Sequence, residues 1–125
     1  MKPLLVYVAG PYTPTDMSNI DAAQHELEMN IRRAVAVAER VLAKGHIPFI
    51  PHTHTQGYAL RARKCYRGAK ANELFYSWDN VILERCDAIV QYAPSPGADN
   101  EYALAAKLGL LLYKNVEDLP DAVHS

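Results

Sequence analysis

The chain has 125 residues and a net charge of −1, with half of its residues hydrophobic and 22% charged. This length suits one core, and we expect residues 1–125 to form a single domain. The near-neutral charge predicts neither nucleic-acid nor membrane partners, and the longest apolar runs are too short to cross a bilayer. We interpret Cys65 and Cys86, which form no CxxC motif, as reduced thiols in a cytoplasmic protein without a signal peptide, with a disulfide between them as the alternative.

The N-terminal part of the chain predicts a strand followed by a long helix. The run LLVYVA at 4–9 is continuously apolar, which is typical of a strand buried on both faces. A polar loop over 10–19 follows. A stripe at spacings of three and four then predicts an amphipathic helix, with the members Leu27, Ile31, Ala34, Val35, Ala38, Val41 and Leu42. We expect a capping box over 18–21 and an end at Lys44-Gly45, although 18–30 could be a separate short helix.

The remaining elements alternate in the same way. HIPFIP at 46–51 predicts a second strand, whose prolines favour a sheet edge. Residues 52–70 predict a basic loop that either attracts a phosphorylated ligand or is only solvated, and its cations are Arg61, Arg63, Lys64, Arg67 and Lys70. A second amphipathic helix is marked by Leu74, Phe75, Trp78, Val81 and Ile82. The third and fourth strands are expected at 88–92 and 110–113, on either side of a third helix that ends at Gly109.

The predicted order of strands and helices defines a fold class. Alternating strands and helices predict an α/β protein with a doubly wound, mostly parallel sheet of four to five strands and helices on both faces, as in flavodoxin-like and Rossmann-like folds. The polar tail over 114–125 receives no assignment. Ligands of such folds bind at the carboxyl ends of the strands, which here are followed by the loops after Ala9, Pro51 and Tyr92.

Two carboxylates are candidates for chemistry near these loops. YAPSPGADNEYAL at 92–104 runs from a Pro/Ser/Gly loop into a helix, and we place Glu101 in the first helical turn. An acid there either complements the helix dipole or is a nucleophile kept ionised by it. Asp79 is either a helix-surface residue or the second member of a carboxylate pair that divides the roles of nucleophile and proton donor.

Other motifs are weaker. Ser95 and Gly97 could bind a phosphate at the start of the third helix, or simply form a turn. His52 and His54 could share a metal ion, but no nearby acid or cysteine completes a ligand set, so we predict no metal site. The chain has no GxGxxG or GxxxxGKS motif, which indicates neither dinucleotide nor P-loop chemistry, and we predict no cofactor.

Four stretches together resemble the nucleoside 2-deoxyribosyltransferase superfamily, which includes the nucleoside 5′-monophosphate N-glycosidases. They are VYVAGPYT, GHIPFIPH, WDNVILERCDAIV and SPGADNEYALAAKLG, at 6–13, 45–52, 78–90 and 95–109. The resemblance implies that Glu101 attacks C1′ of the sugar, that Asp79 acts on the nucleobase side, and that Tyr7 orients the nucleophile. It also implies a homodimer or a larger homo-oligomer.

The resemblance favours a nucleotide substrate over a free nucleoside. Transferases of the superfamily carry an acid six positions before the nucleophile, whereas the N-glycosidases carry a serine that contacts the 5′-phosphate, and Ser95 occupies this position. The first loop, however, lacks the arginine that many of these N-glycosidases use for the phosphate. The expected substrate-binding residues are Gly10, Pro11, Tyr12, Asn19, His52, Ser95, Gly97 and Ala98. Hydrolysis of a nucleoside 5′-monophosphate is therefore the predicted activity, with base exchange or non-catalytic nucleotide binding as alternatives.

Overall fold

The computed structural model describes residues 1–53 and 69–122, with only the backbone of residues 69–76. The elements in chain order are β1 (Leu5–Ala9), α1 (Ile20–Ala43), β2 (Ile47–Phe49), α3 (Ala69–Glu84), β3 (Ala88–Gln91), α4 (Pro96–Leu108), β4 (Leu111–Tyr113) and the 3-10 helix η1 (Val116–Asp118). Within these residues the strands form a four-stranded sheet in the order β2-β1-β3-β4, and all neighbouring strands are parallel. This topology confirms the predicted doubly wound α/β fold class.

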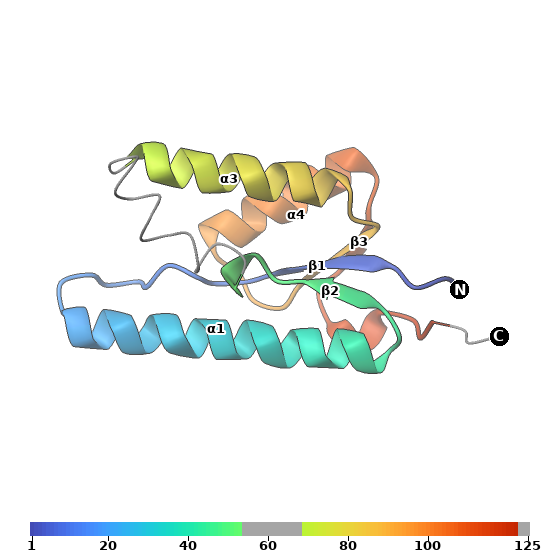
Figure 1. Cartoon of the computed structure of the whole chain (residues 1–125), viewed down its shortest axis with the longest axis horizontal. Coiled ribbons are helices and arrows are strands. Elements are labelled where there is room, and N and C mark those ends of the chain that lie inside the picture. The colour runs from blue at the N-terminus through green and yellow to red at the C-terminus, as the bar shows by residue number, and fades with distance from the viewer. Residues whose placement is uncertain (54–68, 123–125) are drawn as a thin grey trace.

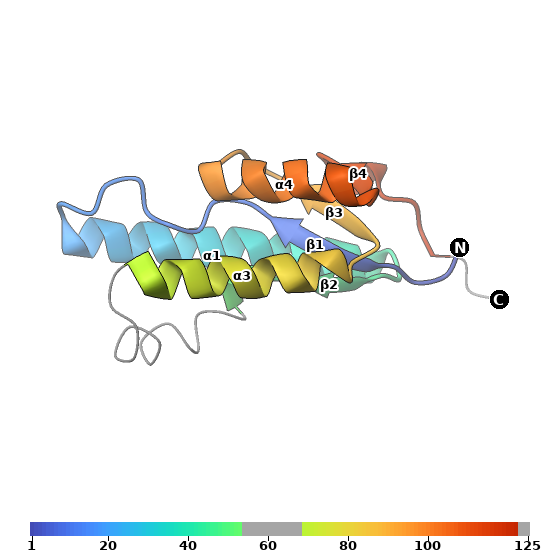
Figure 2. The same ribbon diagram turned by 90° about the horizontal axis from the view of Figure 1, so that it is seen from above.

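Helices cover both faces of the sheet, as Figures 1 and 2 show. α1 lies on one face, and α3 and α4 lie on the other. The side chains of β1 alternate between two cores: Val6 and Val8 pack on the α1 side, whereas Tyr7 and Ala9 pack on the side of α3 and α4. All four are fully buried, so this strand is covered on both faces, as its continuous apolar run predicted.

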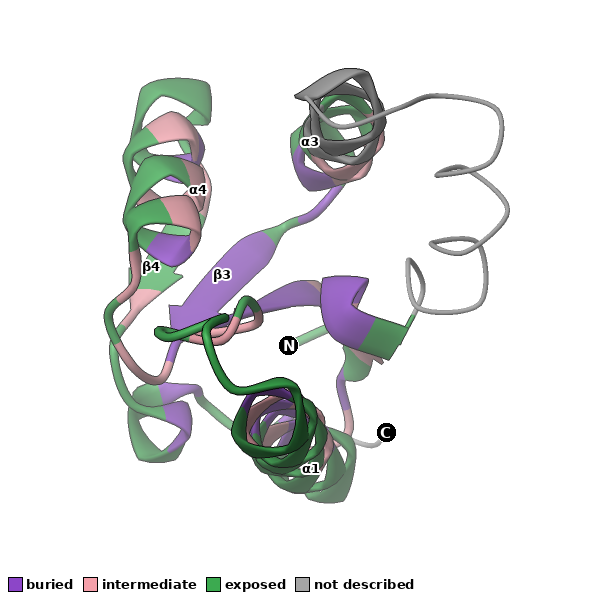
Figure 3. Ribbon diagram, turned by 90° about the vertical axis from the view of Figure 1, so that its left-hand side faces the viewer, coloured by how far each residue is buried: buried purple, intermediate pink, exposed green. Residues whose placement is uncertain are grey.

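The two central strands end at the same level. β3 is buried along its whole length (Figure 3), and its last residue, Gln91, is in register with Ala9 at the end of β1. The loops that follow these two strands therefore leave the same edge of the sheet. β2 pairs only with β1, so Pro48 lies in an edge strand, which confirms the prediction made from its missing N–H.

α1 is one continuous helix, so the alternative of a separate short helix over 18–30 is wrong. Its N-cap is Asn19, whose side chain accepts a hydrogen bond from the Ala22 N–H, and the expected capping box at Ser18 does not form. The helix ends before Gly45, which has a φ of 88° and provides the predicted left-handed stop. Leu42, which we expected in the buried stripe, is 58% exposed.

The other helices differ from expectation mainly at their N-termini. α3 begins at Ala69, so Lys70 belongs to this helix and not to the predicted basic loop. The other cations of that loop lie outside the described residues. Leu83, which the predicted stripe of α3 omitted, is fully buried, and Val81, which it included, is exposed. α4 ends at Gly109, which has a φ of 79°, as expected for a left-handed C-cap.

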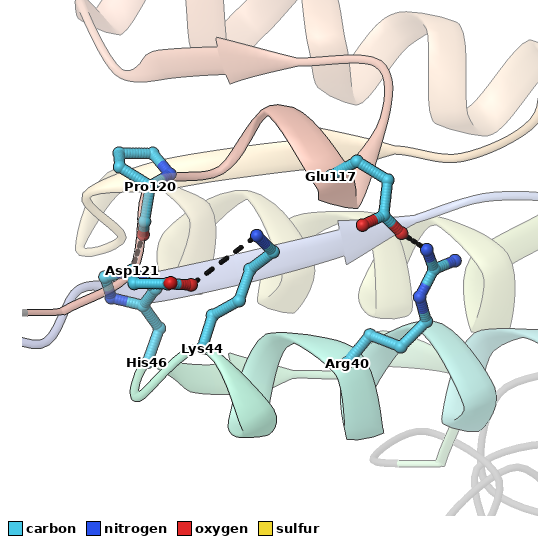
Figure 4. Close-up of polar contacts among 6 residues, drawn as sticks. All are labelled: Arg40, Lys44, His46, Glu117, Pro120 and Asp121. Atoms are coloured by element: carbon cyan, nitrogen blue, oxygen red, sulfur yellow. Dashed lines mark hydrogen bonds and ion pairs between the residues drawn. The ribbon is translucent and has the colours of Figure 1, made fainter.

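The polar tail is part of the folded structure as far as Ala122. η1 and the residues after it lie beside the C-terminal end of α1, where Figure 4 shows the polar contacts that join the two segments. The Ala122 N–H donates to the Lys44 carbonyl over 2.8 Å, and ion pairs join Arg40 to Glu117 and Lys44 to Asp121. The buried side chains of the tail complete the core on the α1 face: they are Val116, Leu119 and Ala122.

His46 connects this tail to the start of the sheet. Its ring is 2% exposed, and Nδ1 lies 2.9 Å from the Leu4 nitrogen, whose N–H it accepts. Nε2 faces the Pro120 carbonyl, which can only accept. Nε2 must therefore carry the ring proton, and the neutral ring links two segments that are far apart in sequence.

Replacing His46 by alanine should lower the free energy of unfolding by about 2–4 kcal/mol, because both hydrogen bonds and the packed ring are lost. Urea unfolding followed by circular dichroism measures this change. His25→Ala, at an exposed position on α1, is the matched control and should stay within about 0.5 kcal/mol of the parent. If the urea unfolding curves of His46→Ala and His25→Ala have equal midpoints and slopes, the hydrogen bonds of His46 contribute nothing to stability.

Candidate active site

The site lies where the central strands end. The loop after β1 leads to α1 on one face of the sheet, and the loop after β3 leads to α4 on the other face. Neighbouring strands of this parallel sheet send their connections to opposite faces, and this is where ligands of such folds bind. Figure 3 views the molecule from this side.

Tyr7 brings a polar group into the core close to this end of the sheet. It is the middle residue of β1 and faces the α3 and α4 side, where its side chain is fully buried. Its hydroxyl donates a hydrogen bond to Oε2 of Glu101. Burial and the charge of Glu101 raise the pKa of Tyr7 far above its usual range, so the phenol is a permanent proton donor.

Glu101 occupies the second turn of α4, and the prediction that it lies in the first turn is wrong. The helix begins at Pro96, and the acid of its first turn is Asp99. The field of the helix dipole falls off within the first turn, so it is not what sets the ionisation of Glu101. Burial raises the pKa of Glu101 to about 7, the hydrogen bond from Tyr7 opposes this shift, and the charge of Asp79 adds to it.

Asp79 is the second acid that the structure brings to this point, from α3. Burial raises the pKa of Asp79 to about 7. Its charge also raises the pKa values of Glu101 and Tyr7, which places the three side chains within electrostatic reach of one another. Oδ1 of Asp79 is buried and has no hydrogen-bond partner among the described residues. A buried oxygen without a partner is costly, and a catalytic role or a bound water or ion is among its explanations.

A pocket gives access to this cluster between α3 and α4. It has a volume of about 380 Å³ and is lined by Asn80, Gly97, Asn100, Glu101 and Leu104. Sequence reasoning missed the two asparagines, although each directly adjoins a predicted catalytic acid in the sequence. Their amides both donate and accept, which suits the hydroxyl groups of a sugar or the edge of a base.

One of the N–H donors at the start of α4 is already occupied by the N-cap side chain. Ser95 is the N-cap, and its Oγ accepts from the Ala98 N–H over 3.1 Å. Pro96 has no N–H to offer. An anion here would therefore be bound by the Ser95 O–H and the Gly97 N–H, and Ala98, which we expected to bind substrate, serves the cap.

The first loop is held against the end of β2. Nε2 of His52 lies 2.8 Å from the Pro11 carbonyl, and its ring meets Tyr12 edge-on at 5.3 Å between centroids. Burial lowers the pKa of His52. A Cβ on Gly10 would collide with the ring of Tyr92, so a larger residue at this position would force that ring to move.

Asn19 lies apart from these residues. Its side chain caps α1, and the N-terminus of this helix projects well beyond the sheet (Figure 1). The metal alternative depended on His54, which lies outside the described residues. Of the two cysteines, Cys65 also lies outside them, and the Cys86 thiol is buried and unpaired, with its pKa raised to about 11 by burial.

A polar network on the other flank of α4 was not foreseen. Nζ of Lys114 donates to Oε1 of Gln91 over 2.6 Å and lies 3.8 Å from the centre of the Tyr102 ring. Nε2 of Gln91 donates to Oδ1 of Asp99, also over 2.6 Å. A second pocket of about 320 Å³ adjoins this network and is lined by Gln91, Tyr92, Ala93, Pro94 and Lys114.

Comparison with known families identifies the chain at the level of a domain family. The family described as "Domain of unknown function (DUF1937)" matches residues 4–102, and the chain therefore belongs to it. No curated protein matches the sequence. The family description gives no activity, so the resemblance to nucleoside 2-deoxyribosyltransferases stays a prediction. Among the described residues, no helix has the length and apolarity needed to cross a membrane.

Asp79→Asn should stabilise the protein at alkaline pH. The folded state raises the pKa of Asp79 from 3.8 to about 7 and so favours the protonated carboxyl. The contribution of this group to stability is fully present below pH 4 and is lost as the pH rises to 7. The melting temperature of the variant relative to the parent should therefore increase between pH 5 and pH 8, as differential scanning calorimetry can measure. Glu28→Gln, at an exposed position on α1, should show no such trend, and a parallel trend in both variants would contradict the assignment.

Proposed function

We propose that this member of the DUF1937 family hydrolyses the N-glycosidic bond of a nucleoside 5′-monophosphate. The products are the free base and the sugar 5-phosphate. The observation that carries the proposal is the pair of partly buried carboxyl groups, Glu101 and Asp79, with raised pKa values, of which Glu101 lines a pocket and is affected by the charge of Asp79. Retaining glycosidases use such a pair as nucleophile and as acid and base.

Glu101 is the nucleophile in this proposal. Tyr7 holds Oε2, which leaves Oε1 to attack C1′ as the bond from C1′ to the base nitrogen breaks. The bonding electrons leave with the base, and a glycosyl ester forms on Glu101. The carboxylate also stabilises the positive charge that develops on the sugar in the transition state.

Asp79 moves the proton. With a pKa near 7, its protonated form is available at neutral pH to protonate the departing base. The resulting carboxylate then takes a proton from water, which attacks C1′ and releases the sugar from Glu101. Asp79 is protonated again at the end of the cycle, and Glu101 returns as a carboxylate.

The same carboxyl pair argues against a module that only binds nucleotides. Burying a carboxyl group costs free energy, and a negative charge beside a phosphate site weakens anion binding. Among the described residues, neither Glu101 nor Asp79 forms a salt bridge that would offset this cost. A catalytic role accounts for two partly buried acids with raised pKa values in one region of the structure.

A panel of ribo- and deoxyribonucleoside 5′-monophosphates, assayed for free base by chromatography, tests the proposal. At least one member should be hydrolysed, and Glu101→Gln should lower kcat by at least about 10³-fold, because the nucleophile is lost while the shape is kept. Glu28→Gln is the matched control and should keep the parental rate. Folded protein that releases no base from any member would overturn the proposal.

Adding a second free base to the same assay separates hydrolysis from exchange. Hydrolysis predicts that the sugar 5-phosphate remains the main product. If a new nucleotide forms faster than the sugar phosphate, the protein is a transferase that uses the same glycosyl ester. Binding of nucleotides without base release, unchanged in Glu101→Gln, would favour the non-catalytic alternative.

The pH profile of kcat/KM should be bell-shaped, with its maximum near pH 7. Activity should fall at low pH as Glu101 becomes protonated, and at high pH as Asp79 loses the proton that the base requires. Because the two groups interact, the two limbs report values that belong to the pair. Asp79→Asn should abolish the alkaline limb. A profile that is flat between pH 5 and pH 9 would contradict this division of roles.

A further inference from the structure

We infer that the pocket between the β3–α4 loop and Lys114 binds a phosphoryl group, with the Lys114 ammonium as its cation. The inference rests on the proposed function in one respect, which is that the phosphoryl group belongs to the nucleotide substrate. Lys114 follows β4 at the edge of the sheet where the strands end, and it lines the pocket together with Pro94 and Ala93. Neither the motifs nor the resemblance assigned it a role.

Two contacts orient the ammonium group of Lys114, and one of its N–H donors is available to a ligand. One N–H of Lys114 is used by Oε1 of Gln91, and the face of the Tyr102 ring receives a second. The third has no acceptor among the described residues. Gln91 is itself buried and is fixed by its bond to Asp99, so Lys114 is oriented before any ligand binds.

The pocket supplies the charge that the first loop lacks. Residues 10–19 contain no lysine or arginine, so a phosphate between the two loops finds no cation on the β1 side. On the β3 side, only Ser95 separates Pro94 of this pocket from the start of α4. The pocket with Lys114 thus directly precedes the start of α4, and we expect the Lys114 ammonium to act together with the donors there on one phosphoryl group. Arg33 of α1 adds positive charge on the side of Tyr92, where it lowers the pKa of the phenol against the effect of burial.

Replacing Asp99 should change the anion affinity in the opposite direction to replacing Lys114. Its carboxylate lies behind Gln91, where its negative charge offsets part of the positive charge of Lys114. Asp99→Asn keeps an oxygen that accepts from Gln91 but removes the charge. This variant should bind an anion more tightly, whereas Lys114→Met should bind it more weakly. A network that only stabilises the fold predicts no opposite effects on anion affinity.

Calorimetric titration with inorganic phosphate at constant ionic strength measures the site without any need for catalysis. Lys114→Met should raise the dissociation constant by about tenfold, as expected for the loss of one charge-assisted contact. Lys107→Met, at the exposed C-terminal end of α4, is the matched control and should leave it unchanged. Lys114→Arg keeps the charge and should bind better than Lys114→Met. Equal affinity in the parent and Lys114→Met would overturn the inference, and if Lys114→Met fails to fold, a lack of tightening in Asp99→Asn would do the same.

Competition and kinetics decide whose phosphoryl group the pocket takes. Phosphate should compete with the nucleotide, and Lys114→Met should raise the KM for the nucleotide more than it lowers kcat. If phosphate binds at Lys114 but does not compete, the assignment to the substrate is overturned. If phosphate binds at Lys114 and no nucleotide is hydrolysed, the N-glycosidase proposal fails while the phosphoryl pocket stands. If the nucleotide is hydrolysed and Lys114→Met leaves its KM unchanged, the N-glycosidase proposal stands and the assignment of the phosphoryl pocket to the substrate fails.

Discussion

Burial of β1 on both faces is the constraint from which the site follows. A strand in the middle of a parallel sheet must send alternate side chains into two cores. At Tyr7 this places a phenol hydroxyl inside the core between the sheet and α4, where a buried donor needs an acceptor. Glu101 provides that acceptor. The hydrogen bond therefore fixes which side of α4 faces the sheet, and with it the position of the proposed nucleophile.

The acids of the site are tuned by burial more than by the helix dipole. Glu101 lies one turn too deep in α4 for the field at the helix start to decide its ionisation. Desolvation is the main cause of the raised pKa of both Glu101 and Asp79, and the charge of Asp79 raises the pKa of Glu101 further. A nucleophile and a proton donor require one ionised and one protonated carboxyl near neutral pH, and raised pKa values favour that state. The same arrangement costs stability, which is typical of functional sites.

Most of the fold could be predicted from sequence because local signals specify it. Continuous apolar runs marked the strands, Pro48 marked the sheet edge, and Gly45 and Gly109 marked helix ends. The exact N-cap of α1 was wrong because Ser18 and Asn19 both suit a cap, and local sequence does not decide between them.

The candidate site was only partly predictable. The two acids were candidates from their places in the sequence, and a resemblance that extends over several separate motifs gave their roles and added Tyr7. The polar partners Asn80 and Asn100, and the whole network of Lys114, depend on how distant segments pack. The tail over 114–125 was unassigned for the same reason. Pro120 contacts His46 across 74 positions, and no local sequence pattern predicts such a contact.

In the proposed function, the two flanks of α4 give the anion and the nucleophilic acid separate positions. Asp99 and Glu101 are two residues apart, so they lie about 200° apart around the helix axis. Glu101 faces the pocket beside α3, whereas Asp99 faces the network of Lys114 beside β4. In the proposed binding mode, the nucleotide lies over the N-terminal end of α4, with its sugar carbon toward Glu101 and its phosphoryl group toward Lys114. The charge of the phosphate then faces the ammonium of Lys114 and not the carboxylate of Glu101.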